Sequence, residues 1–265
     1  MSENKSITSR NMELEYSIDN GIGYRTHLGF IILANDQTLP YELHRLLDIP
    51  GVAIYESKQV IPVNPNALLT KEVLESQKDY ITNAARIINA RREPDVVAYG
   101  CTSGAMTLGS DVVAGKINEV LPNAIVTNPL VASIEAFHTL RVRKVAFLSP
   151  YIPDVNNGVI RKFQEHGIEV PLSGRFYKEG SNPSKDAPWI TPESIEKAIL
   201  IAGKDDDIEG VFISCTQMRF VDNIEETEKK LGKPIVTSNT ALCWHALRLS
   251  GCIDIVNGFG KLLKF

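Results

Sequence analysis

Two cysteines occupy matching positions in two similar segments of the chain. The segments are Asp95–Gly104 and Glu209–Gln217, in which an apolar run rich in β-branched residues stops at a small residue and a Cys-Thr pair follows. Such a run is typical of a buried strand of a parallel sheet that opens into a loop. Open α/β sheets bind ligands at the carboxyl ends of their strands. The sequence therefore predicts that Cys101 and Cys215 lie at facing edges of one site.

Two facing thiols could move a proton across a small substrate. A free thiol has a pKa of about 8.5, and we expect the free N–H groups and dipole of a strand-to-helix turn to lower it at both cysteines. One thiolate and one thiol could then remove a proton from one side and return it on the other, or add to a double bond. An isolated buried cysteine is usually a small apolar residue, and we interpret Cys243 and Cys252 in that way.

Polar side chains near the predicted strand ends could bind an anion. Thr102 and Ser103 follow the first cysteine, and Thr216 follows the second. Their hydroxyl and backbone N–H groups could converge on a carboxylate or an enolate, although such residues also serve as plain helix N-caps. Asn35 and Tyr151 come just after the first strand of each half, where uncharged donors would suit a substrate carboxylate.

Composition and motifs exclude several classes of protein. The 265 residues carry a formal charge of -4, and lysine and arginine are scattered, so we expect no nucleic-acid partner. The cysteines and histidines lack the spacing of a structural metal site, and no glycine-rich phosphate loop follows a strand. We therefore expect neither a metal nor a cofactor.

The N-terminal residues 1–22 are expected to form a flexible extension. The segment from Met1 to Asn20 is polar and has no apolar core, so it predicts neither a signal peptide nor a membrane span. With four cysteines that form no obvious disulfide framework, a cytoplasmic, reducing location fits best.

Strand and helix patterns alternate from Gly23 onward, and three strand ends recur in the same order in the second half of the chain. Phe30 aligns with Phe147, the two cysteines align with each other, and Val126 aligns with Val236. We infer a duplicated α/β unit. Residues 23–124 with 238–265 are expected to form a first domain, which carries Cys101, and residues 125–237 a second domain, which carries Cys215.

Several ordered motifs resemble the Asp/Glu racemase superfamily, and most closely its branch of maleate cis-trans isomerases, arylmalonate decarboxylases and ectoine-utilisation A proteins. The motifs are Tyr99–Gly104, Leu148–Tyr151, Phe212–Thr216, Gly232–Asn239 and Ala241–His245. The resemblance spans residues 23–251. It implies two flavodoxin-like α/β domains with parallel sheets, related by pseudo-twofold symmetry, and a cofactor-free site in the cleft between them.

The resemblance also implies roles for the site residues. In the isomerase branch, the cysteine that matches Cys101 attacks the double bond of maleate, and the one that matches Cys215 donates or accepts a proton. Asn35 and Tyr151 would match contacts to the substrate carboxylates. In the decarboxylases, glycine replaces the first cysteine, and the partner of Cys215 protonates an enediolate. This chain keeps both thiols, while its loop Ala34–Thr38 is nearer the ectoine-utilisation branch.

Three functions follow as hypotheses. The first is an isomerase or racemase of a small carboxylate, such as a maleate-like dicarboxylate or an amino-acid derivative, with two facing cysteines. The second is an arylmalonate-type decarboxylase that uses Cys215 as proton donor and an oxyanion pocket at Thr102 and Ser103. The third is a carboxylate-binding protein without turnover, because a fold by itself fixes no function. The expected partners are the small carboxylate and further copies of the chain, by default in a dimer, but no membrane.

Overall fold

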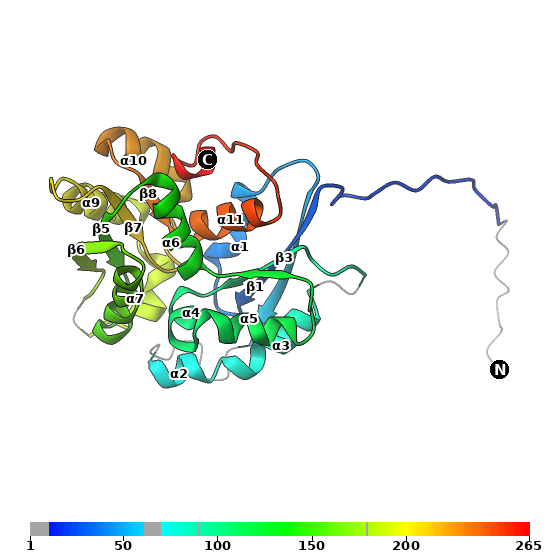
Figure 1. Cartoon of the computed structure of the whole chain (residues 1–265), viewed down its shortest axis with the longest axis horizontal. Coiled ribbons are helices and arrows are strands. Elements are labelled where there is room, and N and C mark those ends of the chain that lie inside the picture. The colour runs from blue at the N-terminus through cyan, green and yellow to red at the C-terminus, as the bar shows by residue number, and fades with distance from the viewer. Residues whose placement is uncertain (1–10, 61–69, 89–90, 179) are drawn as a thin grey trace, which may run out of the picture.

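The structure, a computed structural model, describes residues 11–60, 70–88, 91–178 and 180–265. Residues 11–20 are exposed, form neither helix nor strand, and lead away from the rest of the molecule (Figure 1). The first ten residues of the expected N-terminal extension lie outside the described residues.

Within the described residues, eight strands form two parallel sheets with the same strand order. The first sheet runs β2-β1-β3-β4 and the second runs β6-β5-β7-β8. The strands are β1 (Thr26–Leu33), β2 (Val52–Gln59), β3 (Val96–Gly100), β4 (Ile125–Thr127), β5 (Lys144–Ser149), β6 (Glu169–Arg175), β7 (Gly210–Ile213) and β8 (Ile235–Thr237). The repeated order confirms the predicted α/β class with two sheet domains.

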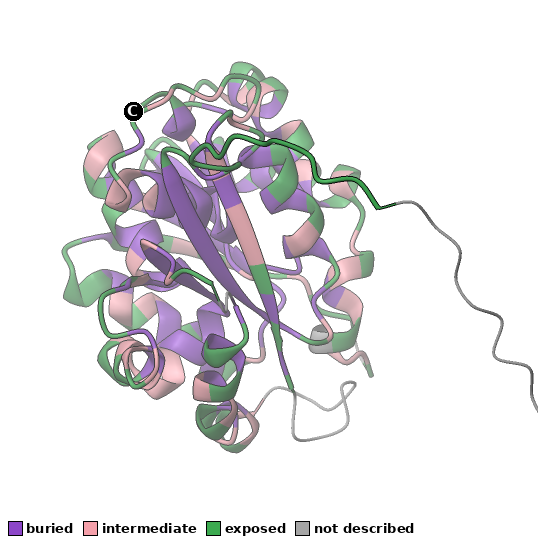
Figure 2. Cartoon of the chain, turned by 90° about the vertical axis from the view of Figure 1, so that its right-hand side faces the viewer, coloured by how far each residue is buried: buried purple, intermediate pink, exposed green. Residues whose placement is uncertain are grey.

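The apolar strand sequences reflect burial on both faces. All eight residues of β1 and all five of β3 are buried, as expected for central strands of a parallel sheet covered by helices (Figure 2). The edge strand β6 instead alternates between exposed and half-buried residues. The central strands therefore form a rigid base for the loops at their carboxyl ends.

Helices connect the strands and cover the sheets (Figure 1). They are α1 (Thr38–Leu46), α2 (Lys71–Glu75), α3 (Lys78–Arg86), α4 (Thr102–Leu108), α5 (Ser110–Asn118), α6 (Pro129–Leu140), α7 (Pro153–Glu165), α8 (Pro183–Asp186), α9 (Pro192–Gly203), α10 (Ile224–Leu231) and α11 (Ser238–Leu249), with 3-10 turns η1 (Ala187–Trp189), η2 (Val221–Asn223) and η3 (Leu262–Lys264). Thr70 caps α2, and the break before α3 includes the buried Gln77, which accepts a hydrogen bond from the Tyr99 hydroxyl.

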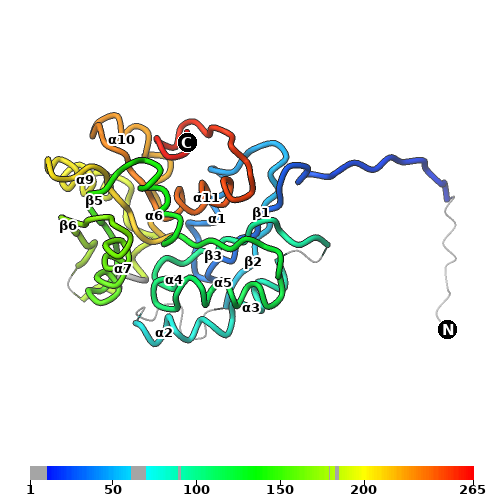
Figure 3. The backbone as a smooth tube through the Cα atoms, viewed as in Figure 1, coloured from blue at the N-terminus to red at the C-terminus, as the bar shows by residue number. Residues whose placement is uncertain are grey.

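The chain crosses between the two halves after β4 and again after β8 (Figure 3). Helix α6 leads from β4 to the second sheet, and α11 returns from β8 to pack against α6, α1 and β3. The expected domain boundary after residue 124 is wrong by one strand, because Ile125–Thr127 pairs with β3 in the first sheet. A strand of only three residues, with no linker sequence beside it, carries too little pattern to predict which sheet it joins.

Candidate active site

Cys101 follows β3 and caps the N-terminus of α4. Its sulfur accepts a hydrogen bond from the backbone N–H of Gly104 at 3.2 Å and lies 3.7 Å from the Ser103 hydroxyl. The residue is buried, with 4% of its surface exposed. The expected turn at the carboxyl end of this strand is therefore present, with its N–H groups directed at a thiol.

Cys215 follows β7 and has a strained backbone. Its φ is +113°, a region that residues with a side chain rarely adopt. Its N–H donates to the hydroxyl oxygen of Ser238, with 2.9 Å between nitrogen and oxygen. Strain of this kind persists only where surrounding contacts enforce it, and it clusters at functional sites.

Ser238 joins the two cysteine loops. Its hydroxyl lies 2.9 Å from the hydroxyl of Thr102, the residue after Cys101, and also holds the N–H of Cys215. Ser238 and Thr102 are both buried first residues of helices, α11 and α4. No chemical motif in the sequence indicates Ser238 as a site residue, although the repeated strand ends at Val126 and Val236 mark this position as part of the duplication.

Burial raises the pKa of both thiols, and for Cys215 it raises the pKa to about 12. The charge of Asp36 acts in the same direction on both cysteines. The N–H groups of Gly104 and Gln217 oppose the effect on Cys101 and Cys215, respectively. The expectation that the turns lower the thiol pKa is therefore wrong, because desolvation outweighs the donors. Both cysteines are protonated thiols at neutral pH in this closed arrangement.

Tyr151 lies beside Cys215, as expected from its position after β5. Burial raises the pKa of its phenol well above the ordinary value, and its oxygen lies 3.4 Å from the Ser214 hydroxyl. Tyr151 and Cys215 line a cavity of about 10 Å³ together with Ile152, Val155 and other residues. That space holds roughly one water molecule, so a substrate needs the walls to move apart.

Asp36 and Thr216 connect the loops after β1 and β7. The Thr216 hydroxyl donates to Asp36 Oδ2 at 2.7 Å, and Asp36 Oδ1 accepts the N–H groups of Thr38 and Leu39 at 2.9 Å each. Asn35 is half-buried and directly precedes this carboxylate. The loop that carries Asn35 thus contacts the loop that carries Thr216. No local sequence pattern indicates the buried acid Asp36, because its partner Thr216 is 180 positions away.

A second buried carboxylate, Glu42, connects α1 by hydrogen bonds to the segment that precedes α10. It accepts the N–H groups of Phe220 and Val221 at 2.8 and 3.1 Å, and the amide of Asn239 at 2.6 Å. Burial raises its pKa to about 7, and the charge of Asp36 adds to the effect. This contact was also missed, since a glutamate on an amphipathic helix gives no sign of burial.

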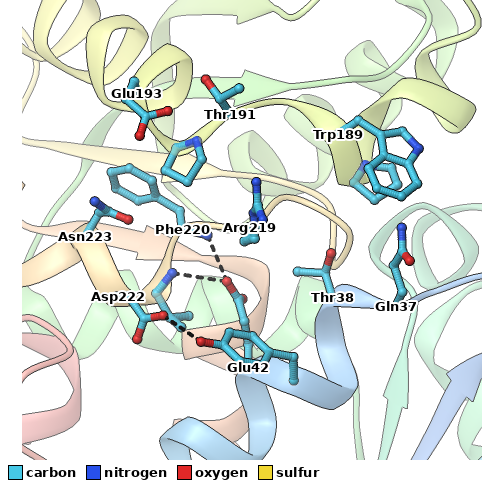
Figure 4. Close-up of a pocket in the computed structure, with 14 residues that line it drawn as sticks. Gln37, Thr38, Glu42, Trp189, Thr191, Glu193, Arg219, Phe220, Asp222 and Asn223 are labelled. Carbon is cyan, nitrogen blue, oxygen red and sulfur yellow. Dashed lines mark hydrogen bonds between the residues drawn. The ribbon is translucent and has the colours of Figure 1, made fainter.

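Glu42 forms part of the wall of a groove of about 690 Å³ (Figure 4). The groove lies between α1 and the segments that precede α9 and α10, and Arg219 and Trp189 contribute exposed side chains to it. Thr38, on its wall, donates to the carbonyl of Gln217, which also lines the small cysteine cavity. The Thr38–Gln217 hydrogen bond therefore joins a wall of the groove to a wall of the cysteine cavity.

The described part of the chain contains no helix that is long and apolar enough to cross a membrane. It also contains no group of three or more His, Cys, Asp or Glu side chains arranged to hold a metal ion. The candidate site consists of two thiols at equivalent strand ends, with hydroxyl groups nearby, and Ser238 connects the two loops that carry them. Such a site can donate, accept and relay protons at a small carbon acid or alkene.

Sequence comparisons relate the chain to known enzymes. A sequence model of the arylmalonate decarboxylase family matches residues 69–263. A maleate isomerase from Pseudomonas putida is 25% identical over 183 residues, which cover 64% of this chain and 70% of that protein.

Solved structures share the fold. A crystal structure of a Pseudomonas putida maleate isomerase, a cysteine-to-alanine variant with maleate, superposes with a TM-score of 0.79 at 21% identity, covering 90% of this chain and 97% of that one. A cysteine-to-serine mutant of the Nocardia farcinica maleate cis-trans isomerase, with a covalently bound succinylcysteine intermediate, has a TM-score of 0.74 at 20% identity, covering 90% and 98%.

Proposed function

The chain belongs to the arylmalonate decarboxylase family, and we propose that it is a cofactor-independent isomerase or racemase of a small carboxylate in which Cys101 and Cys215 react as a pair. The observation that supports the proposal is the hydrogen-bonded connection from the Cys215 backbone through Ser238 to Thr102, the residue after Cys101, which links the two cysteine loops. Maleate isomerases among the relatives favour a cis-butenedioate or a similar dicarboxylate as substrate.

The two thiols differ in a way that supports distinct roles. Cys101 receives the N–H of Gly104 and lies near the Ser103 hydroxyl, and both groups stabilise a thiolate. Burial raises the pKa of Cys215 to about 12, which suits a group that delivers a proton. Cys101 is therefore the nucleophile in the proposal, and Cys215 is the proton donor.

The proposed reaction begins from the pair with one proton removed. The Cys101 thiolate forms a C–S bond to one alkene carbon, and the electron pair of the double bond takes the Cys215 proton at the other carbon. This adduct is a succinyl thioether, the kind of species held in the Nocardia farcinica structure. Rotation about the new C–C single bond, return of a proton to the Cys215 thiolate and cleavage of the C–S bond then give the trans alkene and restore the starting state.

Substrate binding is assigned to Asn35, Thr102, Ser103, Tyr151 and Thr216. The hydroxyls of Thr102 and Thr216 are already bonded to Ser238 and Asp36, so in the closed structure they shape the loops. The Ser103 hydroxyl lies 3.7 Å from the Cys101 sulfur, and the Tyr151 hydroxyl is a hydrogen-bonding neighbour of the Cys215 thiol. These two hydroxyls are the proposed donors to the substrate carboxylates. Neutral hydroxyl donors can bind a carboxylate without placing a positive charge beside the thiols, which would lower the thiol pKa.

A decarboxylase of the arylmalonate type is the second candidate, favoured by the protonated state of Cys215. A malonate would lose carbon dioxide by C–C cleavage, and the remaining enediolate would take the Cys215 proton. Solvent would then return a proton to the thiolate. Cys101 has no bond to form in this reaction, so its loss should matter little.

Proton NMR in heavy water separates the candidates. The substrates are maleate, D- and L-aspartate and a phenylmalonate, each with the wild type, Cys101→Ala, Cys215→Ala and, as a matched control, the buried core variant Cys243→Ala. Isomerisation or α-deuterium exchange that both site variants abolish and the control retains supports the proposal. Carbon dioxide release that survives the loss of Cys101 supports the decarboxylase, and turnover unaffected by either site variant contradicts both.

A further inference from the structure

We infer that Ser238 is a positioning residue for the two-thiol reaction, which sets the Cys215 backbone and its placement relative to Cys101. The inference rests on the proposed function, because it assigns Ser238 a task in that chemistry. Ser238 itself is fully buried and needs no contact with the substrate.

The position of Ser238 is fixed by the helix that follows it. Thr237 and Thr240 form a reciprocal capping box, in which the Thr237 hydroxyl accepts the N–H of Thr240 at 3.0 Å and the Thr240 hydroxyl accepts the N–H of Thr237 at 2.9 Å. Such a box determines the direction in which the chain enters the helix. Ser238 therefore presents its hydroxyl from a rigid helix end.

That hydroxyl connects the two cysteine loops directly. It accepts the N–H of Cys215 and shares a hydrogen bond with the hydroxyl of Thr102, each over 2.9 Å. Thr102 is covalently attached to Cys101, the N-cap of α4. The Ser238 hydroxyl oxygen therefore bridges the backbone nitrogen of Cys215 and the side chain of Thr102, which follows Cys101. Ser238 and Thr102 are 136 positions apart in the sequence.

The hydrogen bond from the Cys215 N–H to Ser238 holds a strained backbone conformation in place. A side-chain-bearing residue at φ +113° relaxes unless a contact holds it. The bond to Ser238 satisfies the buried N–H in this conformation, so its loss removes both the partner and the restraint. Because bond formation at carbon depends on placement of the reacting atoms to well under 1 Å, a relaxed Cys215 loop would slow the reaction without weakening substrate binding.

The test is Ser238→Ala in the full-length protein. We expect kcat to fall roughly 10- to 100-fold with KM changed by less than about twofold. We also expect alkylation of Cys215 by iodoacetamide, followed peptide by peptide, to become several-fold faster relative to Cys243. Ser238→Thr keeps a hydroxyl on the same carbon and should restore most of kcat and the slow alkylation.

Ser133→Ala is the matched control. Ser133 is also a fully buried helical serine, and its hydroxyl donates to the Pro129 carbonyl, outside the site. This variant should lose stability without a change in kcat or in Cys215 alkylation. Unchanged kcat in Ser238→Ala, or a Cys215 alkylation rate at or below that of the wild type, overturns the inference. If the wild type turns over none of the substrates, the proposed function fails, while the alkylation comparison still decides whether Ser238 restrains Cys215.

Discussion

The hydroxyl of Thr216 donates a hydrogen bond to the buried carboxylate of Asp36, with 2.7 Å between the two oxygens. The bond joins the loop after β7 to the loop after β1, and so connects the two sheet domains. The same carboxylate acts electrostatically on both cysteines and disfavours their thiolates. One side chain therefore influences both the closure of the site and the ionisation of its thiols.

Replacing Asp36 by asparagine should make both thiols more reactive. The amide keeps an oxygen for the N–H groups of Thr38 and Leu39 but removes the charge, so the pKa of Cys101 and of Cys215 should fall. We expect alkylation of both cysteines at pH 8 to become several-fold faster by peptide mapping. Asp79→Asn, an exposed change on α3, should have no such effect. Equal rates in Asp36→Asn and the wild type would show that the charge does not reach the thiols.

The raised thiol pKa values predict a rate that increases with pH. The proposed reaction needs the pair with one proton removed, and both thiols have a pKa above the ordinary value, about 12 for Cys215. Below such a pKa the reactive fraction grows tenfold per pH unit. A plot of log kcat/KM should therefore rise with a slope near 1 from about pH 7 to pH 9 for an isomerisation substrate. A plateau beginning below pH 8 would contradict a buried, protonated pair.

The fold could be predicted largely because its strands carry a local signal. The apolar runs of β1, β3 and β5 mark buried parallel strands without any knowledge of their partners, and their recurrence reveals the duplication. The three-residue strand β4 has no such signal, and only its hydrogen bonds to β3 assign it to the first sheet.

The sequence predicts a site where the repeat itself carries the information, and it gives no sign of the residues that act through tertiary contacts. Cys101 and Cys215 are predicted as site residues because their strand ends match. The effect of burial on their pKa values is not predicted, because the sequence shows the helix turn but not the loss of water around the sulfur. Asp36 and Ser238 act through partners 180 and 136 positions away, beyond the reach of any local pattern.

Glu42 should make the folded protein less stable as the pH rises toward neutrality. Burial raises its pKa from 4.5 to about 7 in the folded state, so the folded protein binds more protons than the unfolded chain between these values. The free energy of unfolding should therefore fall between about pH 4.5 and pH 7, by about 3 kcal/mol from this residue, and this contribution should level off above pH 7.

Urea unfolding of the wild type and Glu42→Gln from pH 5 to pH 8 measures this contribution. The variant has no titrating group at that position, so the difference between the two unfolding free energies should change across this range. Glu135→Gln, an exposed change on α6, should follow the wild type. Parallel curves for Glu42→Gln and the wild type would mean that Glu42 stays ionised in the fold.

Alanine at Gly104 should displace the Cys101 sulfur. A Cβ there would lie 3.0 Å from that sulfur and 2.8 Å from the Tyr99 hydroxyl oxygen, closer than ordinary contacts allow. We expect kcat to fall about tenfold or more, since small displacements of a reacting atom are costly, and the free energy of unfolding to drop by about 1–3 kcal/mol.

Gly115→Ala provides the matched comparison, because a Cβ at that position in α5 meets nothing within 4 Å. It should raise the free energy of unfolding by up to about 1 kcal/mol through helix propensity and leave kcat unchanged. Steady-state kinetics and urea unfolding of both variants measure the two effects separately. If Gly104→Ala loses stability but retains full kcat, the expected displacement of the Cys101 sulfur either does not occur or does not affect the rate, and the prediction is wrong.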